Sequence, residues 1–134
     1  MAFIVDASIA LAWFFKEERT KRTTSLLRRV AEEDAIVPCL WHYEVSSGLL
    51  MGIRRGRVPA EAAHDRLARL AQLRLEVDAH LVDRFSTIVQ LATETQLSVY
   101  DATYLELAMR RNAPLATNDQ SLARAATSKK VKLL

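Results

Sequence analysis

Four acidic residues are set apart from the other charged residues of this chain, because each lies among mainly apolar or small neighbours. They are Asp6, Glu44, Asp101 and Asp119. If their carboxylates lie close together, they cannot all stay ionised without a cation, since like charges repel strongly at short range. Either some of them protonate, or a hard divalent ion such as Mg²⁺ or Mn²⁺ binds to their oxygen atoms. Such an ion lowers the pKa of a bound water and stabilises the oxygens of an in-line displacement at phosphorus. The four acids therefore predict metal-dependent phosphoryl chemistry.

Other metals and nucleophiles have less support. The three histidines, His42, His64 and His80, lie in different parts of the chain, and Cys39 is the one cysteine. Zinc sites need a cluster of such residues, so we expect neither zinc nor a histidine-based ribonuclease. His42 lies two residues before Glu44, but we expect a surface or packing role for it, and a packing role for Cys39.

Short apolar runs alternate along the chain with longer stretches of helical periodicity. We expect strands over residues 3–5, 35–37, 73–78, 114–117 and 131–134, and helices over 8–15, 19–33, 40–53, 60–72, 81–95, 101–111 and 120–126. This alternation favours an α/β fold, a three-layer α/β/α sandwich with a short central parallel sheet. The chain has 134 residues, 50% of them hydrophobic, and no internal repeat or linker, so we expect residues 1–134 to form a single domain.

An open parallel sheet binds its ligands beyond the carboxyl ends of its strands. Asp6 ends the first expected strand and Asp119 closely follows the fourth, while Asp101 opens a helix and Glu44 lies one turn into another. All four acids are therefore expected on one rim of the sheet. Taken singly, Asp6 could be an ordinary helix cap, and Asp119 a turn residue. Asp101 could likewise be only a cap, followed by Glu106 and Arg110 as a solvated pair. Glu44 is harder to explain in this way, because its helix is apolar on nearly every side.

The chain carries a small excess of positive charge. A formal charge of +3 and a sequence pI near 9.3 suit a polyanionic partner, although a merely solvated surface explains them equally well. The basic groups near Arg54 and Arg110 could follow an RNA backbone. No apolar run approaches the ~20 residues that a membrane helix needs, and residues 1–6 do not resemble a secretory signal. We therefore expect a cytoplasmic protein with no membrane association.

The ordered set of acidic motifs resembles that of the PIN-domain nucleases. Val5-Asp6-Ala7-Ser8-Ile9-Ala10-Leu11 looks like the opening motif of this family, and Pro38 to Val45 looks like its second acidic motif. Asp101 to Ala108 resembles the third motif, and Leu115-Ala116-Thr117-Asn118-Asp119 resembles the fourth. The resemblance spans nearly the whole chain. It is particularly close to the stand-alone bacterial toxins of the VapC type, which are about this length.

The resemblance implies a metal-dependent endoribonuclease that leaves a 5′-phosphate and a 3′-hydroxyl. Asp6, Glu44 and Asp101 would hold the Mg²⁺ or Mn²⁺ ion, and Asp119 would complete the cluster directly or through water. All four would then be catalytic and metal-binding residues.

Several neighbouring residues have implied supporting roles. The hydroxyls of Ser8 and Thr117 match positions that usually support the acids, although a helix N-cap and a strand-end hydroxyl are equal alternatives. Many relatives carry an asparagine three residues after the glutamate, where this chain has Ser47, which reaches less far toward a carboxylate or a water. Trp41 and Tyr43 could stack RNA bases, but we expect them to pack within the protein.

The resemblance also implies partners. These are an RNA substrate, a second copy of the chain in a homodimer, and a cognate antitoxin protein that lays a helix and an extended tail across the active-site groove. Trp13-Phe14-Phe15 and Leu49-Leu50-Met51 offer more apolar surface than one core-facing stripe requires. Filling the core or a dimer seam would account for most of this surface.

Three other functions fit parts of the pattern. A catalytically idle PIN fold could serve as an RNA-binding or scaffold protein, but it would have no need for a complete set of mutually repelling acids. A Mg²⁺-dependent phosphatase with an aspartyl nucleophile needs a second carboxylate two residues after Asp6, where this chain has Ser8. A phospho-receiver module needs paired acids at the first strand, and Asp6 stands alone there.

Overall fold

A four-stranded parallel sheet lies at the centre of the protein, in a computed structural model that covers residues 1–134. The strand order is β3-β2-β1-β4. Ile4 of β1 pairs with Ile36 of β2 and with Leu115 of β4, and β3 pairs with β2, all in parallel. The strands are β1 (Phe3–Val5), β2 (Ala35–Pro38), β3 (Leu75–Asp78) and β4 (Leu115–Ala116). The predicted parallel sheet is confirmed.

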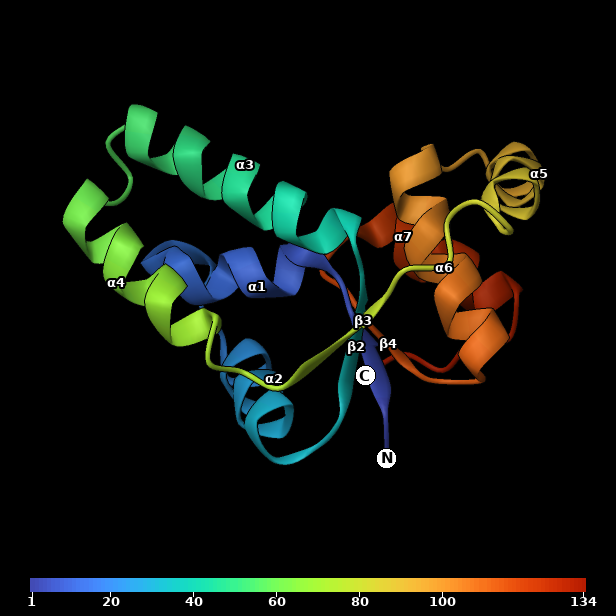
Figure 1. Ribbon diagram of the computed structural model, residues 1–134, viewed down its shortest axis with the longest axis horizontal. Coiled ribbons are helices and arrows are strands. Elements are labelled where there is room, and N and C mark those ends of the chain that lie inside the picture. The colour runs from blue at the N-terminus through green and yellow to red at the C-terminus, as the bar shows by residue number, and fades with distance from the viewer.

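Seven α-helices cover the sheet. They are α1 (Ala7–Phe14), α2 (Lys21–Glu32), α3 (Leu40–Arg54), α4 (Ala60–Leu70), α5 (Phe85–Thr95), α6 (Val99–Arg111) and α7 (Gln120–Ser128), with a 3₁₀ turn, η1, at Lys16–Glu18. Figure 1 views the sheet along its edge, with α1 to α4 on one side and α5 to α7 on the other. This arrangement confirms the three-layer α/β/α sandwich. None of the helices combines the length and the apolar character needed to cross a bilayer.

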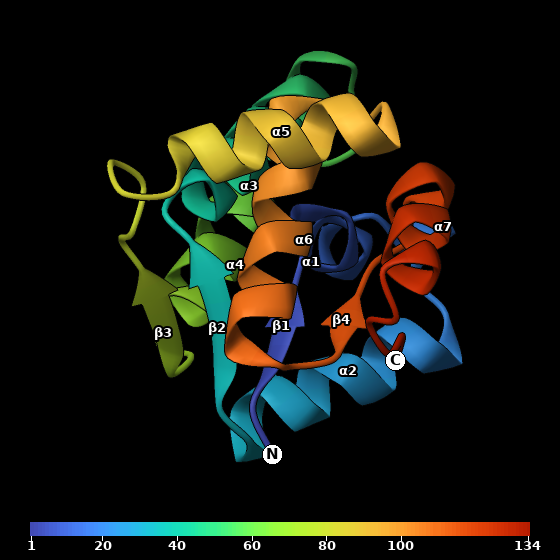
Figure 2. The same cartoon turned by 90° about the vertical axis from the view of Figure 1, so that its right-hand side faces the viewer.

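The two central strands are buried along their whole length, because helices cover both of their faces. Their sequences are accordingly continuous apolar runs, as expected of buried parallel strands. The strand β3 lies at the edge of the sheet, where Glu76 and Val77 are exposed. The strands point upward in Figure 2, so their carboxyl ends lie at the upper rim of the sheet.

Two glycines allow α1 to approach α3 closely. A Cβ atom at Gly48 would lie only 2.6 Å from Cδ1 of Leu11 on α1, and one at Gly52 would also meet a side chain at short range. Glu44 precedes Gly48 by one helical turn, and Asp6 caps the start of α1. The close packing of these two helices therefore helps to bring the first two acidic motifs together.

Several predicted boundaries were wrong. The helix expected from residue 101 begins at Val99, because Ser98 is its N-cap and accepts the backbone N–H of Asp101 at 3.1 Å. The helix expected from residue 81 begins only at Phe85. The strand expected at 131–134 is reduced to a single bridge between Leu133 and Leu115, since β4 spans only two residues and offers little to pair with.

Candidate active site

Asp6 is held by three donors at the carboxyl end of β1. Its Oδ1 accepts the hydroxyl of Ser8 at 2.5 Å and the backbone N–H of Ile9 at 3.3 Å, and its Oδ2 accepts the hydroxyl of Thr117 at 2.5 Å. Asp6 is also the N-cap of α1, and its side chain is only 4% exposed. Asp6 therefore both caps α1 and is held in a fixed position at the carboxyl end of β1.

Burial makes the ionised form of Asp6 unfavourable. The pKa of Asp6 is raised from 3.8 to about 6, mainly because burial desolvates the carboxylate; the charge of Asp101 adds to the rise, while the bonds from Ser8, Thr117 and Ile9 offset part of it. A carboxylate in this state gains from a nearby cation. The hydroxyls of Ser8 and Thr117 orient the Asp6 carboxylate, but as neutral groups they do not cancel its charge.

Thr117 connects the first acidic motif to the last. Its hydroxyl donates to Asp6 and accepts the backbone N–H of Asp119 at 2.9 Å. The hydroxyl of Ser8 similarly accepts the backbone N–H of Asn118 at 2.8 Å. Asp119 is the N-cap of α7, and its Oδ1 accepts the N–H of Leu122 at 2.8 Å.

Glu44 reaches the site from α3 and is half-buried. The hydroxyl of Tyr104, on α6, donates to Oε1 of Glu44 at 2.8 Å. Burial raises the pKa of Glu44, the bond from Tyr104 offsets part of the rise, and the charges of Asp101 and Asp6 add to it. Glu44 is therefore within electrostatic range of both acids.

Asp101 occupies the third position of α6 rather than the predicted cap position. Burial raises the pKa of Asp101, and the charge of Asp119 adds to the rise, against a smaller lowering by the Ser98 hydroxyl. A carboxylate in the first helical turn is also favoured by the helix dipole. The third acid therefore interacts with the fourth from the first turn of α6, although it does not cap the helix.

The four acids form one electrostatic cluster without a basic partner. Each interacts with at least one other acid of the set, and no Lys or Arg side chain forms an ion pair with any of them. In the arrangement observed, no three His, Cys, Asp or Glu side chains are grouped so that they could hold a metal ion by themselves. Mg²⁺ is usually bound by one or two carboxylates together with waters and substrate phosphate. Carboxylates whose ionised forms are made unfavourable by burial and mutual repulsion offer only oxygen ligands, and they therefore fit such an ion.

The sequence was also compared with known proteins. A family model described as PIN domain matches residues 3–128, which is nearly the entire chain. The chain belongs to the PIN-domain family. This PIN domain is similar to Ribonuclease VapC3 from Pyrobaculum aerophilum, with 30% identity over 128 residues that cover 92% of this chain and 93% of the relative. It is also similar to Ribonuclease VapC9 from Mycobacterium tuberculosis, with 34% identity over 121 residues that cover 90% and 87% of the two chains.

Solved structures share the fold of this PIN domain. PAE2754 from Pyrobaculum aerophilum superimposes with a TM-score of 0.68 at 27% identity, covering 93% of this chain and 87% of that one. The Mycobacterium tuberculosis toxin VapC20 gives a TM-score of 0.65 at 17% identity, covering 92% and 94%. FitAcB from Neisseria gonorrhoeae gives 0.67 at 16% identity, covering 100% and 96%. The last two likenesses, at such low identity, concern the fold alone.

The residues predicted to flank the PIN-domain site differ in exposure. Trp41 is 2% exposed and packs in the core as expected, whereas Tyr43 is 79% exposed, so the packing role expected of Tyr43 was wrong. Of the predicted apolar surface, Trp13-Phe14-Phe15 is buried within the chain, while Leu50 and Met51 remain exposed on α3. Of these predicted residues, Tyr43, Leu50 and Met51 are therefore available for contacts outside the chain.

Two expectations about burial were wrong, namely that Cys39 is buried and that the pair of Glu106 and Arg110 is solvated. Cys39 is exposed at the start of α3, although its Sγ contacts the carbonyl oxygen of Asp78 at 3.6 Å. Arg110 does pair with Glu106 at 2.8 Å, but Glu106 is 5% exposed, so the pair is buried rather than solvated. Arg110 also donates to both carboxylate oxygens of Asp78 at 3.0 Å, which fastens α6 to the edge strand β3. These residues stabilise the fold beside the site.

Sequence reasoning missed Tyr104, the one hydrogen-bond donor to Glu44. A signal was present, because Tyr104 lies three residues after Asp101 and so shares its side of α6. It also missed Arg22, which donates to the Asn118 side chain at 2.8 Å and to the carbonyl oxygen of Thr117 at 3.1 Å. Arg22 thereby braces the segment that carries the fourth acid, and nothing in its local sequence indicates this contact.

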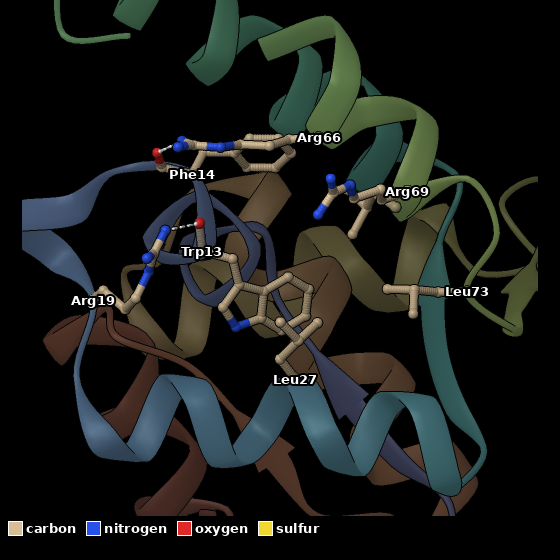
Figure 3. Close-up of a pocket in the computed structure, with 8 residues that line it drawn as sticks. Trp13, Phe14, Arg19, Leu27, Arg66, Arg69 and Leu73 are labelled. Atoms are coloured by element: carbon tan, nitrogen blue, oxygen red, sulfur yellow. Dashed lines mark hydrogen bonds between the residues drawn. The ribbon is translucent and has the colours of Figure 1, made fainter. Parts of the chain in front are cut away.

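An apolar cavity of about 270 Å³ lies away from the acids, between α1, α2 and α4. Figure 3 shows Trp13 and Leu27 at its base and Arg69 and Leu73 around it. Arg19 donates to the carbonyl oxygen of Trp13 at 2.9 Å, and Arg66 donates to that of Phe14. The two guanidinium groups therefore cap the end of α1, and the cavity contains none of the predicted site residues.

Proposed function

We propose that this PIN domain is a Mg²⁺- or Mn²⁺-dependent endoribonuclease and the toxin of a toxin–antitoxin pair. The observation that carries the proposal is the cluster of four carboxylates, which come from four separate segments and have no basic partner. Its relatives VapC3 and VapC9 are named ribonucleases, and the structural neighbour VapC20 is titled a sarcin-ricin loop cleaving toxin. The chemistry of the cluster and the names of the relatives support the same activity.

The acids have distinct roles in this proposal. Asp6, Glu44 and Asp101 hold the divalent ion, and Asp119 completes the cluster directly or through water. When bound, the ion supplies an activated water and stabilises charge on the oxygens of the phosphodiester. Thr117 and Ser8 keep Asp6 oriented through bonds of 2.5 Å each. Asp119 uses Oδ1 to cap α7, which leaves Oδ2 to orient a water.

The proposal includes three partners: RNA as the substrate, a cognate antitoxin protein and a second copy of the chain. The exposed apolar side chains of Leu50 and Met51 on α3 and of Phe85 and Val89 on α5 support a protein–protein contact. They are 39% to 59% exposed, more than a core position allows. Light scattering on the purified chain, with Phe85→Ser as the variant, tests the dimer.

The activity is tested with total bacterial RNA. The purified chain is incubated with Mg²⁺, with Mn²⁺ and with chelator, beside the variants Asp6→Asn and Asp34→Asn. Asp34 is exposed and lies outside the cluster, so it is the matched control. We expect discrete fragments that require both the metal and Asp6, with Asp34→Asn behaving as the unmodified protein. Full cleavage by Asp6→Asn, or in chelator, would overturn the metal-dependent mechanism. No cleavage by folded protein free of antitoxin would favour the RNA-binding alternative.

A further inference from the structure

One arginine, Arg22, joins α2 to two other segments of the chain. Its Nη1 donates to Oδ1 of Asn118 at 2.8 Å, and its Nη2 donates to the carbonyl oxygen of Thr117 at 3.1 Å. Its Nε donates to the carbonyl oxygen of Leu134 at 3.0 Å. Each nitrogen of the planar guanidinium group therefore has an acceptor, and none of these acceptors belongs to an acidic side chain.

The segment that the arginine holds also supports Asp6. The hydroxyl of Thr117 donates to Oδ2 of Asp6 at 2.5 Å and accepts the backbone N–H of Asp119 at 2.9 Å. The hydroxyl of Ser8 donates to Oδ1 of Asp6 and accepts the backbone N–H of Asn118 at 2.8 Å. A shift of this segment would therefore disturb both hydroxyl donors to the first acid and would move the fourth acid with it.

The first turn of α2 gives Arg22 a fixed base. The N-cap Thr20 and Thr23 form a capping box around this turn. The indole N–H of Trp13, on α1, donates to the carbonyl oxygen of Thr23 at 2.8 Å, and both of these residues are buried. Arg22 therefore extends from a turn that is bonded to α1, the helix that Asp6 caps.

We infer that Arg22 is a positioning residue, which holds residues 117–119 and through them the Asp6 carboxylate in the arrangement that RNA cleavage needs, without itself binding the RNA. The inference rests on the proposed function, since it takes the acids to be catalytic. Lysine has the same charge but a single nitrogen, so it cannot replace a planar fork that reaches three acceptors. A displacement of about 1 Å caused by a distant change can slow a reaction on the order of 100-fold.

Hydrogen exchange of single amides measures the position of the segment directly, in the absence of RNA and metal. The amides of Asn118 and Asp119 are the reporters, because both bond to hydroxyls that contact Asp6. We expect Arg22→Lys to speed their exchange about 10-fold, as for the loss of a hydrogen bond to a charged group. The amide of Thr23, which bonds within the capping box, should keep its rate. Unchanged exchange of the reporters, or equal acceleration of the Thr23 amide through fraying of α2, would overturn the inference.

Cleavage and RNA binding are then measured separately, with urea unfolding as the check on folding. We expect Arg22→Lys and Arg22→Ala to slow single-turnover cleavage about 10- to 100-fold. Millimolar guanidinium should restore part of the cleavage by Arg22→Ala, because the free ion can occupy the vacated position. RNA affinity and its salt dependence are measured in the Asp6→Asn background, where Arg22→Ala should match Lys21→Ala. Lys21 is the exposed cation beside Arg22, and Lys21→Ala should cleave as the unmodified protein does.

The outcomes separate this inference from the proposed function. A salt slope reduced by about 1 in Arg22→Ala but not in Lys21→Ala would make Arg22 a phosphate contact and would overturn its positioning role. If cleavage requires Asp6 but is equally fast in both Arg22 variants, only the inference fails. If the folded, unmodified chain cleaves no RNA, the proposed function fails and the inference fails with it.

Discussion

The hydroxyl of Thr117 donates to Oδ2 of Asp6 at 2.5 Å, and the hydroxyl oxygen of Thr117 accepts the backbone N–H of Asp119 at 2.9 Å. A threonine hydroxyl has one hydrogen to donate. Thr117 donates this hydrogen to Asp6, the most buried acid of the cluster, and Thr117 itself is only 5% exposed. Thr117 thus fixes the first acidic motif against the last.

Replacing Thr117 by valine tests this connection, because valine keeps the shape and removes the hydroxyl. We expect Thr117→Val to lower metal-dependent RNA cleavage about 10- to 100-fold, as for other groups that orient a metal ligand. The free energy of unfolding should fall by about 1–3 kcal/mol, since buried Asp6 loses a donor. The control is Thr127→Val, at an exposed threonine of α7 that donates only to the carbonyl oxygen of Ala123. Cleavage at the unmodified rate in Thr117→Val would contradict a supporting role.

The raised pKa of Asp6 predicts how the metal-free protein depends on pH. The folded chain favours protonated Asp6, so between about pH 4 and 6 the unfolded chain binds fewer protons and stability falls as pH rises. A rise from 3.8 to about 6 corresponds to about 3 kcal/mol. The advantage of Asp6→Asn over the unmodified chain should therefore grow by roughly that amount across this window. Urea unfolding in chelator at several pH values measures it. If the free energies of unfolding of the two proteins change with pH in the same way, burial does not destabilise the ionised form of Asp6.

The main features of the fold could be predicted because they depend on local patterns. The buried strands β1 and β2 are continuous apolar runs, and α6 ends at Asn112, where the sequence breaks the helix. Helix starts were harder to predict, since Ser98 and Asp101 are both good caps. The competition was decided by the serine hydroxyl, which accepts the N–H of Asp101.

The acids of the site were found because they stand at the ends of expected elements, whereas their partners depend on the fold. The sequence places Glu44 and Tyr104 60 residues apart, and no periodicity links them. The pair of Arg110 and Glu106 follows from helical spacing, but its burial depends on β3 and α5, which pack over it. Local patterns therefore predicted the acids of the candidate site, while long-range packing determined which side chains contact them.

The buried contact between Asp78 and Arg110 predicts a large effect on stability. Burial alone would raise the pKa of Asp78, but the bonds from Arg110 and from the His80 N–H lower it below its ordinary range. We expect Asp78→Ala to destabilise the fold by roughly 1.5–3 kcal/mol, because Arg110 loses two charge-assisted hydrogen bonds and keeps only Glu106 as its partner. Glu76→Ala, on the same strand, is the control. Glu76 is half exposed and pairs with Arg111 at the surface, so its loss should cost less than about 1 kcal/mol. Chemical unfolding of both variants tests the contrast, and equal losses would refute it.

A polar cavity of about 650 Å³ along α7 predicts where the RNA backbone binds. It lies between α7, which Asp119 caps, and the loop that precedes the helix of Asp101. In its lining, Lys129 is paired with Glu94 at 2.7 Å, whereas Arg124 forms no ion pair. Arg124 is therefore the cation available to a phosphate.

We expect Arg124→Gln to weaken RNA binding and to reduce the slope of log affinity against log salt by about 1, as for the loss of one phosphate contact. The measurement is fluorescence anisotropy of a labelled single-stranded RNA in the Asp6→Asn background, where cleavage does not interfere. The matched control is Arg28→Gln, at an exposed arginine of α2 that is absent from the cavity. Because a phosphate contact carries no base information, the loss should be similar for RNAs of different sequence. An unchanged salt slope in Arg124→Gln would place the RNA backbone on another path, and a slope reduced equally by Arg28→Gln would mean that only overall charge matters.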